Sequence, residues 1–338
     1  MPTTIRDVAK RLNLSITTVS RALDGYDDVA EETRQRVIQT AREMGYVPTR
    51  AARQLRKKRT DMIGYIMPTS QPRFSDPFFS EFIAGLGDEA LNQHFELLIS
   101  VAPPDEEAEI KTYQNWVFGR RVDGLILSRM RQQDWRVDFL ESTQFPFTAF
   151  GRTNSNHHHP YIGVDGKNGI RQLVHHLVEQ GHQRIAFICA PQTLTLQKDR
   201  FEGYLAGLKD ANLPLDTSLL AEGDLTRKGG YLAALQLLSL PQPPTAIIGV
   251  NDLTAIGALR AIHEKGLQAG KQIAIAGFDG IEDTEHTHPP LTTVRQPVYE
   301  IARQLIRLLV KLINGEEVEE GQILIQPELI IRNSTLRE

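Results

Sequence analysis

TIRDVAKRLNLSITTVSR, at residues 4–21, is the stretch that decides the fold of the N-terminal region. The apolar residues of its first half recur at helical spacing and form one stripe: Ile5, Val8, Ala9 and Leu12. Thr4 and Asp7 have the spacing of a helix capping box, and Ser15 is placed to cap a second helix. The stretch therefore predicts two short helices joined by a tight turn.

The second of these helices is predicted to have a polar outer face. Its inward residues are Val19, Ala22 and Leu23, and its outward residues are Ile16, Thr17, Ser20 and Arg21. A helix with small polar side chains and an arginine, held at a steep angle by another helix, suits the major groove of DNA. An ordinary helical hairpin with a solvated face has the same spacing, so the pattern alone leaves both interpretations open.

A third helix is predicted at residues 31–44, and the basic run RAARQLRKKR follows at residues 50–59. The segments IRDVAKRLNLSITTVSRAL, VAEETRQRV, GYVP and AARQL together resemble the headpiece and hinge helix of the lac repressor (LacI/GalR) family of bacterial transcription regulators. The likeness continues to the end of the chain. It implies an α/β protein with an all-α helix-turn-helix headpiece. The rest would be a two-subdomain, periplasmic-binding-protein-like core of doubly wound parallel sheets.

The charge is segregated along the chain. The 338 residues carry a formal charge of −4, but residues 1–60 hold 13 Lys and Arg against 7 Asp and Glu, a net of +6, so the remainder carries −10. A basic head on an acidic body indicates a polyanionic partner at the head. A solvated linker would explain the basic run but not the segregation. No apolar signal core or membrane-length run occurs, so we expect a cytoplasmic protein.

Beyond residue 60, buried strands alternate with amphipathic helices, which is typical of parallel sheets covered on both faces. The alternation runs twice and indicates two doubly wound subdomains. The second run includes helices predicted at residues 169–179 and 200–211, and residues 163–166 are interpreted as a crossover and turn.

These patterns and the resemblance predict the domain boundaries. We expect a headpiece at residues 1–46, a hinge helix and linker at 47–60, and an effector-binding and dimerisation core at 61–338. By the resemblance, the chain crosses between the core subdomains near residues 162–164, 292–296 and 325–327. The predicted subdomains are an N-subdomain of about 61–162 and 294–325, and a C-subdomain of about 163–293 and 326–338.

The resemblance also implies which residues contact a palindromic operator. Ile16, Thr17 and Arg21 would face base edges, and the phosphate contacts would be Thr4, Ser15, Ser20 and Thr33. The hinge contacts would be Ala52, Arg53, Leu55 and Arg56. We expect the hinge to fold on DNA as a pair of helices, one from each subunit of a homodimer, with Leu55 as a wedge in the minor groove.

Polar side chains follow three strands of the C-subdomain, where doubly wound sheets bind ligands. Arg200 is predicted to open the helix after one strand, Asn251 and Asp252 follow the next, and Asp279 follows a third. A guanidinium, an amide and a carboxylate together suit a polyhydroxylated ligand, although each alone fits a cap or turn, as Asp252 would. The family binds its effector with residues matching Arg200, Asn251 and Asp279.

Three apolar residues complete the predicted cleft. Leu225 matches a position that is often aromatic in the family, which puts sugar stacking there in doubt. Phe78 and Phe79, in the segment DPFF, would either wall the cleft from the N-subdomain or belong to the core.

The effector implied by the resemblance is a sugar, a nucleobase or a phosphoprotein partner. The segments DPFF, FGRT and DRFEGY look most like regulators that respond to α-glucosides. The rival classes are a doubly wound enzyme and a transport-binding protein. The first leaves the basic headpiece unexplained and has no acid, base and nucleophile set, and the second would need a signal peptide. No cofactor is predicted, and no metal, because the run of histidines at residues 157–159 reads as a loop with diverging side chains.

Overall fold

The computed structural model describes residues 3–23, 25–46, 59–68, 76–103, 105–154 and 159–336. The chain divides into two compact units, Met1–Thr60 and Asp61–Glu338. Within the described ranges, no helix is long and apolar enough to cross a membrane.

The described residues of the N-terminal unit form three short helices: α1 (Ile5–Leu12), α2 (Ile16–Leu23) and α3 (Glu31–Glu43). The Asp7 carboxylate accepts hydrogen bonds from the backbone N–H of Thr4 at 2.8 Å and from its hydroxyl at 2.7 Å. Asn13 ends α1 in the left-handed conformation, and Ser15 Oγ accepts a hydrogen bond from the Thr18 N–H at 3.0 Å. The apolar stripes meet in a core of Val8, Ala9, Val19, Ala22, Val29, Val37 and Ala41. The predicted helix-turn-helix is confirmed.

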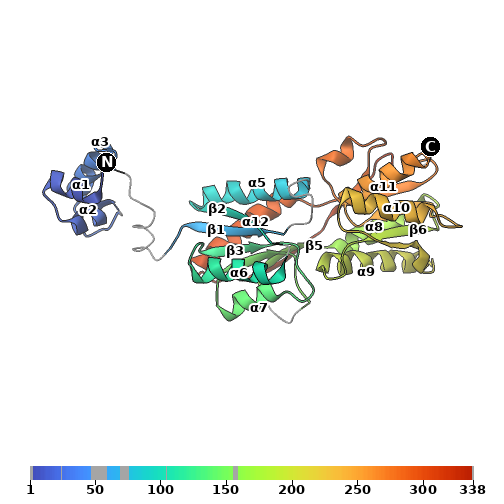
Figure 1. Ribbon diagram of the computed structural model, residues 1–338, viewed down its shortest axis with the longest axis horizontal. Coiled ribbons are helices and arrows are strands. Elements are labelled where there is room, and N and C mark those ends of the chain that lie inside the picture. Colours follow the sequence, from blue (N-terminus) through green and yellow to red (C-terminus); the bar gives the residue numbers. More distant parts are fainter. Residues whose placement is uncertain are drawn as a thin grey trace. The chain divides into compact units, whose positions relative to one another are not determined.

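The first sheet of the core has the strand order β11-β5-β4-β3-β1-β2, and every pair is parallel. Its strands are β1 (Met62–Met67), β2 (Glu96–Val101), β3 (Gly124–Leu127), β4 (Phe147–Phe150), β5 (Tyr161–Val164) and β11 (Gln322–Ile325). One face is covered by α5 (Pro77–Asn92) and α12 (Val298–Ile313), and the other by α6 (Glu106–Phe118) and α7 (Trp135–Ser142) (Figure 1).

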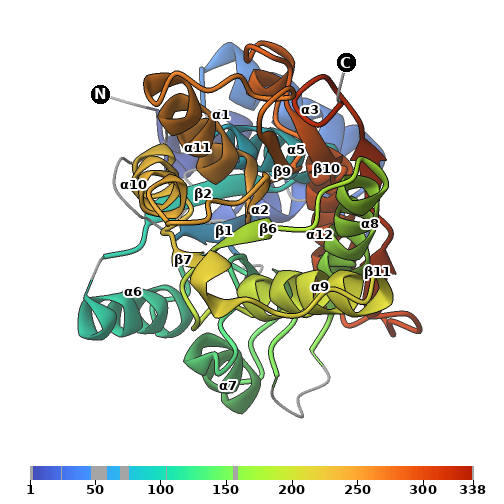
Figure 2. The same cartoon turned by 90° about the vertical axis from the view of Figure 1, so that its right-hand side faces the viewer.

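The second sheet has the order β12-β10-β9-β8-β6-β7, in which only β12 is antiparallel to its neighbour among the described strands. Its strands are β6 (Ile185–Cys189), β7 (Leu220–Glu222), β8 (Ala246–Gly249), β9 (Ala274–Asp279), β10 (Thr292–Arg295) and β12 (Glu328–Ile330). Helices α8 (Gly166–Glu179) and α9 (Thr195–Asp210) cover one face, and α10 (Arg227–Leu238) and α11 (Asp252–Glu264) the other (Figure 2). Two short 3-10 helices lie at Thr217–Leu219 and Glu282–Glu285.

The chain passes between the two sheets after β5, after β10 and between β11 and β12. Residues 163–164, predicted as part of a crossover, are the end of β5 in the first sheet. Val294 and Arg295, predicted in the N-subdomain, pair with β9 of the second sheet. The two predicted boundaries therefore move by about two residues, because the strands continue to the edges of their sheets before the chain crosses.

Two helices begin earlier than their sequence patterns predicted. Helix α8 begins at Gly166 because the Asp165 carboxylate caps it, accepting from the Asn168 N–H at 2.9 Å. Helix α9 begins at Thr195, so Arg200 lies inside the helix and does not open it. Its first residue is held by a hydrogen bond from the Thr195 N–H to the Met130 carbonyl at 3.0 Å, which joins the two halves of the core.

Candidate functional site

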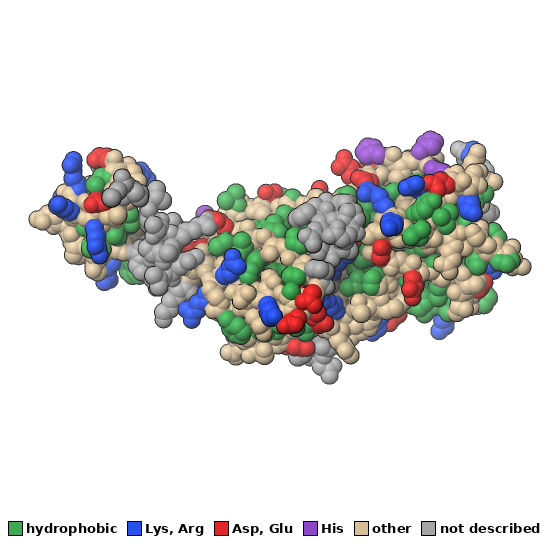
Figure 3. Space-filling view, viewed as in Figure 1, with side chains coloured by type: hydrophobic (Ala, Val, Ile, Leu, Met, Phe, Trp, Pro, Cys, Tyr) green, Lys and Arg blue, Asp and Glu red, His purple; other side chains and the backbone are tan. Residues whose placement is uncertain are grey.

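The outer face of α2 is a candidate DNA-reading surface. Lys and Arg side chains project from the visible face of the N-terminal unit (Figure 3). Ser15, Ile16, Thr17 and Arg21 are exposed, and Ser20 and Thr33 are half-buried. Ile16 is 46% exposed, which is unusual for a large apolar side chain and leaves it available to a partner.

Arg21 is held in place by its own unit. Its Nε donates to Asp28 at 3.1 Å, a second nitrogen forms an ion pair with the same carboxylate, and the guanidinium lies 5.0 Å from the centre of the Tyr26 ring. Both partners are exposed, and exposed pairs of this kind contribute little, so the arginine is easily released to a base. In the absence of DNA, the Thr4 hydroxyl and N–H both donate to the exposed Asp7 carboxylate, so a phosphate contact by Thr4 stays a prediction. The hinge contacts Ala52, Arg53, Leu55 and Arg56 lie outside the described residues.

A cavity of about 870 Å³, including its part open to solvent, lies between the two sheets of the core. It is lined by residues from both halves, and the predicted Phe78, Arg200, Leu225, Asn251 and Asp279 are among them. Five of the six predicted effector residues therefore line one cavity.

Phe79 does not line this cavity. It is 6% exposed and packs in the core around α5, with the Arg129 guanidinium 4.9 Å from its ring centre. Of the two interpretations of DPFF, Phe78 belongs to the cleft and Phe79 to the core.

Arg200 and Asp279 form the centre of the C-subdomain side. The Arg200 guanidinium donates to the Val250 carbonyl at 2.6 Å and to Asp279 Oδ1 at 3.1 Å, and it lies 3.7 Å from the centre of the Phe278 ring. Gln296 Nε2 donates to the same Oδ1 at 2.9 Å. No donor within the described residues contacts Oδ2, so this oxygen remains available to a ligand.

Burial sets the protonation of this pair. It raises the pKa of Asp279 to about 7, although the Arg200 guanidinium opposes the shift, and it lowers the pKa of Arg200. Asp279 also has φ 122°, a conformation that is strained for a residue with a side chain. Such a carboxyl group, buried and held by two donors, is typical of a functional site.

Asn251, and not Asp252 as the sequence suggested, is the residue that caps α11. Asn251 caps α11, because its Oδ1 accepts from the Thr254 N–H at 3.0 Å, while its Nδ2 donates to the Leu225 carbonyl at 3.3 Å. Asp252 is fully buried, and its carboxylate accepts from the N–H groups of Gly280 and Ile281 at 2.7 and 2.9 Å. Asp252 therefore holds the loop after Asp279 in place. Burial raises its pKa to about 6.

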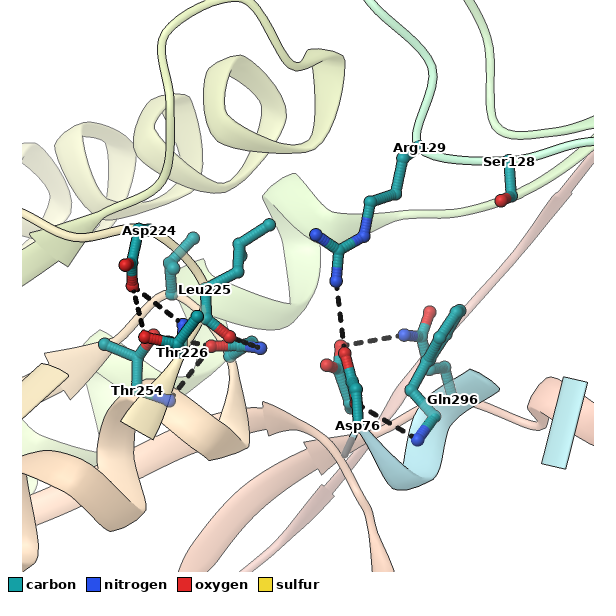
Figure 4. A network of polar contacts seen from close by, with 12 residues as sticks. Asp76, Ser128, Arg129, Asp224, Leu225, Thr226, Thr254 and Gln296 are labelled. Carbon is teal, nitrogen blue, oxygen red and sulfur yellow. Dashed lines mark hydrogen bonds and ion pairs between the residues drawn. The ribbon is translucent and has the colours of Figure 1, made fainter. Parts of the chain in front are cut away.

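The sequence prediction missed several cleft residues from the N-subdomain side. The described residues place two further arginine–aspartate pairs at the cavity: Arg129–Asp76 at 3.1 Å and Arg152–Asp199 at 3.3 Å. Figure 4 shows Arg129 directed at Asp76, with Gln296 nearby. Burial raises the pKa of Asp76 and of Asp199, and the arginines oppose that shift. Arg129 and Arg152 follow β3 and β4, so the rule that found Asp279 would have found them.

An aromatic wall completes the cavity. The rings of Phe78 and Phe150 are nearly parallel, at an angle of 10° with centroids 5.7 Å apart. Leu225, at the position that is often aromatic in the family, is 4% exposed and offers only a small aliphatic side chain to the cavity. Its φ is 67°. The flat apolar surface is thus on the N-subdomain side. No cluster of three or more potential metal-binding side chains occurs among the described residues.

Comparisons with known proteins agree with this geometry. Residues 4–49 match the family described as "Bacterial regulatory proteins, lacI family", and residues 174–335 match "Periplasmic binding protein-like domain". The HTH-type transcriptional repressor CytR of Escherichia coli (strain K12) is 36% identical over 333 residues, which cover 98% of this chain and 96% of that protein.

Two solved structures match nearly the whole chain. The lac repressor dimer bound to operator and the anti-inducer ONPF has a TM-score of 0.87 at 29% identity, over 99% of this chain and 100% of that chain. The complex of the transcriptional regulator CelR with cellobiose has a TM-score of 0.77 at 29% identity, over 98% and 99%. The expected fold class is confirmed.

Proposed function

The chain belongs to the lacI family of bacterial regulatory proteins, and we propose that its cleft binds a neutral sugar, an α-glucoside, that controls operator binding. Its class is that of DNA-binding transcriptional repressors regulated by small-molecule effectors, and its relatives are regulators rather than enzymes. The chemical class of the effector is inferred from the charge and shape of the cavity.

The single observation that carries the sugar proposal is the pairing of the cavity's charges. Among the described residues, the three arginines that line the cavity, Arg129, Arg152 and Arg200, each lie within 3.3 Å of an aspartate. An anionic effector would need an arginine without such a partner. A neutral ligand with many hydroxyl groups instead exploits the remaining acceptors, such as Asp279 Oδ2, and stacks its apolar face on an aromatic wall.

Two alternatives remain within the same regulator class. A purine would also stack on the Phe78 and Phe150 rings. A phosphoprotein corepressor would bind the outside of the core and leave the cavity to another ligand. A sugar-binding protein or an enzyme without a DNA role does not account for the headpiece.

A thermal-shift and calorimetry panel tests the effector. The panel contains maltose, trehalose, sucrose, glucose 6-phosphate, adenine and guanine. A neutral α-glucoside should bind and raise the melting temperature, since a ligand at a hundred times its Kd adds about 2.7 kcal/mol of stability. Phe78→Ala should weaken that binding, whereas Phe118→Ala, which changes an exposed ring on α6 outside the cavity lining, should not. Tighter binding of a purine or of the phosphorylated sugar would contradict the proposal.

The headpiece is proposed to read a palindromic operator as part of a homodimer in the cytoplasm. Ile16, Thr17 and Arg21 would face base edges, and Thr4, Ser15, Ser20 and Thr33 would approach phosphates. The exposure of Ile16, Thr17 and Arg21 on α2 supports this. Light scattering should give a dimer at micromolar concentration, and a stable monomer would contradict it. The hinge contacts Ala52, Arg53, Leu55 and Arg56 remain a proposal from the sequence.

A further inference from the structure

Thr195, the first residue of α9, has a buried hydroxyl that nothing in the described chain satisfies. The side chain is 3% exposed and lines the cavity, and its Oγ1 has no hydrogen-bond partner within the described residues. Buried hydroxyls are nearly always paired, because water is lost on burial and must be replaced by another partner. An unpaired hydroxyl on a residue that lines a ligand cavity therefore indicates a partner that arrives with the ligand.

Hydrogen bonds to the other half of the core hold the backbone of Thr195 in place. Residues 193–195 run antiparallel to residues 130–132 of the other half of the core. The Gln132 N–H donates to the Thr193 carbonyl at 2.8 Å, the Thr195 N–H donates to the Met130 carbonyl at 3.0 Å, and Gln132 Nε2 donates to the Gln192 carbonyl at 2.6 Å. We refer to this two-segment contact as the cross-cleft bridge. It fixes where the hydroxyl of Thr195 lies.

The beginning of α9 has no side-chain cap, although the N–H groups of Thr195 and Gln197 donate to the carbonyls of Met130 and Leu194. Leu194 occupies the capping position, has no side-chain oxygen, and provides no side-chain cap. The first N–H groups of a helix have no acceptor within the helix, and the helix dipole makes this end electropositive. The neighbouring side chains Leu196 and Met130 are apolar, so they cannot supply a partner for the Thr195 hydroxyl.

We propose that Thr195 Oγ1 is a specificity-determining contact that hydrogen-bonds a hydroxyl group of the sugar effector. A threonine hydroxyl donates one hydrogen bond and accepts others, and a sugar hydroxyl does the same, so the two groups are matched in either direction. The inference rests on the proposed function. It adds a hydroxyl-reading residue on the cross-cleft bridge, so the ligand contacts the segment that joins the two halves of the core.

Thr195→Val and Thr195→Ser test the contact, because valine keeps the volume and removes the hydroxyl, and serine keeps the hydroxyl. The full-length protein is used, with maltose as the first probe and otherwise the neutral sugar that binds the wild type most tightly. Calorimetry should show affinity reduced by about 3- to 10-fold in Thr195→Val, the range for one neutral hydrogen bond, and largely kept in Thr195→Ser. A deoxy analogue lacking the contacting hydroxyl should bind the wild type and Thr195→Val equally.

A ligand-free measurement separates a binding role from a structural one. Because its hydroxyl has no protein partner, Thr195→Val should melt no lower than the wild type in the absence of sugar. The matched control is Thr148→Val, where the buried hydroxyl of β4 donates to the Leu305 carbonyl at 3.2 Å. That variant should melt about 2 °C or more below the wild type and bind sugar unchanged.

The outcomes are distinguishable. If no sugar of the panel binds the wild type, the proposed function fails and the assignment of Thr195 fails with it. If a sugar binds and Thr195→Val keeps full affinity, the assignment alone is overturned. A ligand-free Thr195→Val protein that melts well below the wild type would also overturn it, because the hydroxyl would then have a partner inside the protein.

Discussion

Replacing Arg200 with methionine should abolish effector binding and leave operator binding nearly unchanged. The aliphatic part of methionine keeps the packing on Phe278, but the two hydrogen bonds to Val250 and Asp279 are lost. Removing one partner of a buried ion pair destabilises by about 3–5 kcal/mol when the other partner stays charged. Asp279, which is 9% exposed, escapes that penalty by taking up a proton.

The pH dependence follows from the sign of the Asp279 pKa shift. With Arg200 present, burial raises that pKa to about 7, above its ordinary value of about 4. Between about pH 4 and pH 7 the folded protein keeps a proton on Asp279 that the unfolded chain has lost. The contribution of Asp279 to stability therefore falls as pH rises through this range. Without the guanidinium the pKa rises further, and the fall continues above pH 7. The free energy of unfolding of Arg200→Met should therefore fall further below that of the wild type as pH rises. The difference should grow by about 1.4 kcal/mol per pH unit, or about 2 kcal/mol between pH 7 and 8.5.

Urea denaturation at pH 6 and pH 8.5 measures this difference. The control is the double variant Arg200→Met/Asp279→Asn, which has no carboxyl group to titrate and should lack most of the pH-dependent deficit. Calorimetry with the effector should show binding lost in the single variant, and gel shifts at pH 6 should show operator binding within about threefold of wild type, because only coupling is removed. An equal deficit of the single variant at both pH values, or undiminished effector affinity, would refute the reasoning.

Three further predictions concern the headpiece, the hinge and the packing of the core. Arg21→Ala should relax preference at one base pair per half-site in a binding-site selection, by about 1–3 kcal/mol, whereas Asp28→Asn should strengthen operator binding up to about fivefold by releasing Arg21. Leu55→Ala should reduce operator bending and affinity at unchanged dimer stability, and a wild-type bend angle would rule out the wedge. Gly257→Ala should lower the free energy of unfolding by about 3 kcal/mol, because its Cβ would lie 2.0 Å from a carbonyl oxygen of α10. Gly87→Ala on α5, with open space around it, should be neutral or stabilising in the same denaturation assay.

The local features were predictable because they depend on residues within one helical turn. The cap formed by Ser15 and the capping box of Thr4 and Asp7 join residues three positions apart, and both were predicted. The start of α9 could not be predicted in this way. Its anchor is a hydrogen bond from Thr195 to Met130, a residue in the other half of the core, and no local capping residue marks it.

The cleft was predictable in outline and not in detail. Asp279 was found because polar residues at strand ends gather at one edge of a parallel sheet. The same rule applies to Arg129 and Arg152, but it does not say which strand ends lie close to one another. Phe78 and Phe79 are adjacent in sequence and equally apolar. Only packing directs the first to the cavity and the second to the core.

The sequence by itself determined the helical headpiece, the alternation of strands and helices and the separation of charge, since each is a property of neighbouring residues or of simple counts. Only the tertiary structure decided that the arginines at the cavity are paired with aspartates and that the Thr195 hydroxyl has no partner among the described residues. Arg200 and Asp279 are 79 positions apart, and Arg129 and Asp76 are 53 apart. Whether such groups lie within 3 Å or 10 Å of each other depends on how the two sheets fold together, and electrostatic and hydrogen-bond energies depend on that distance.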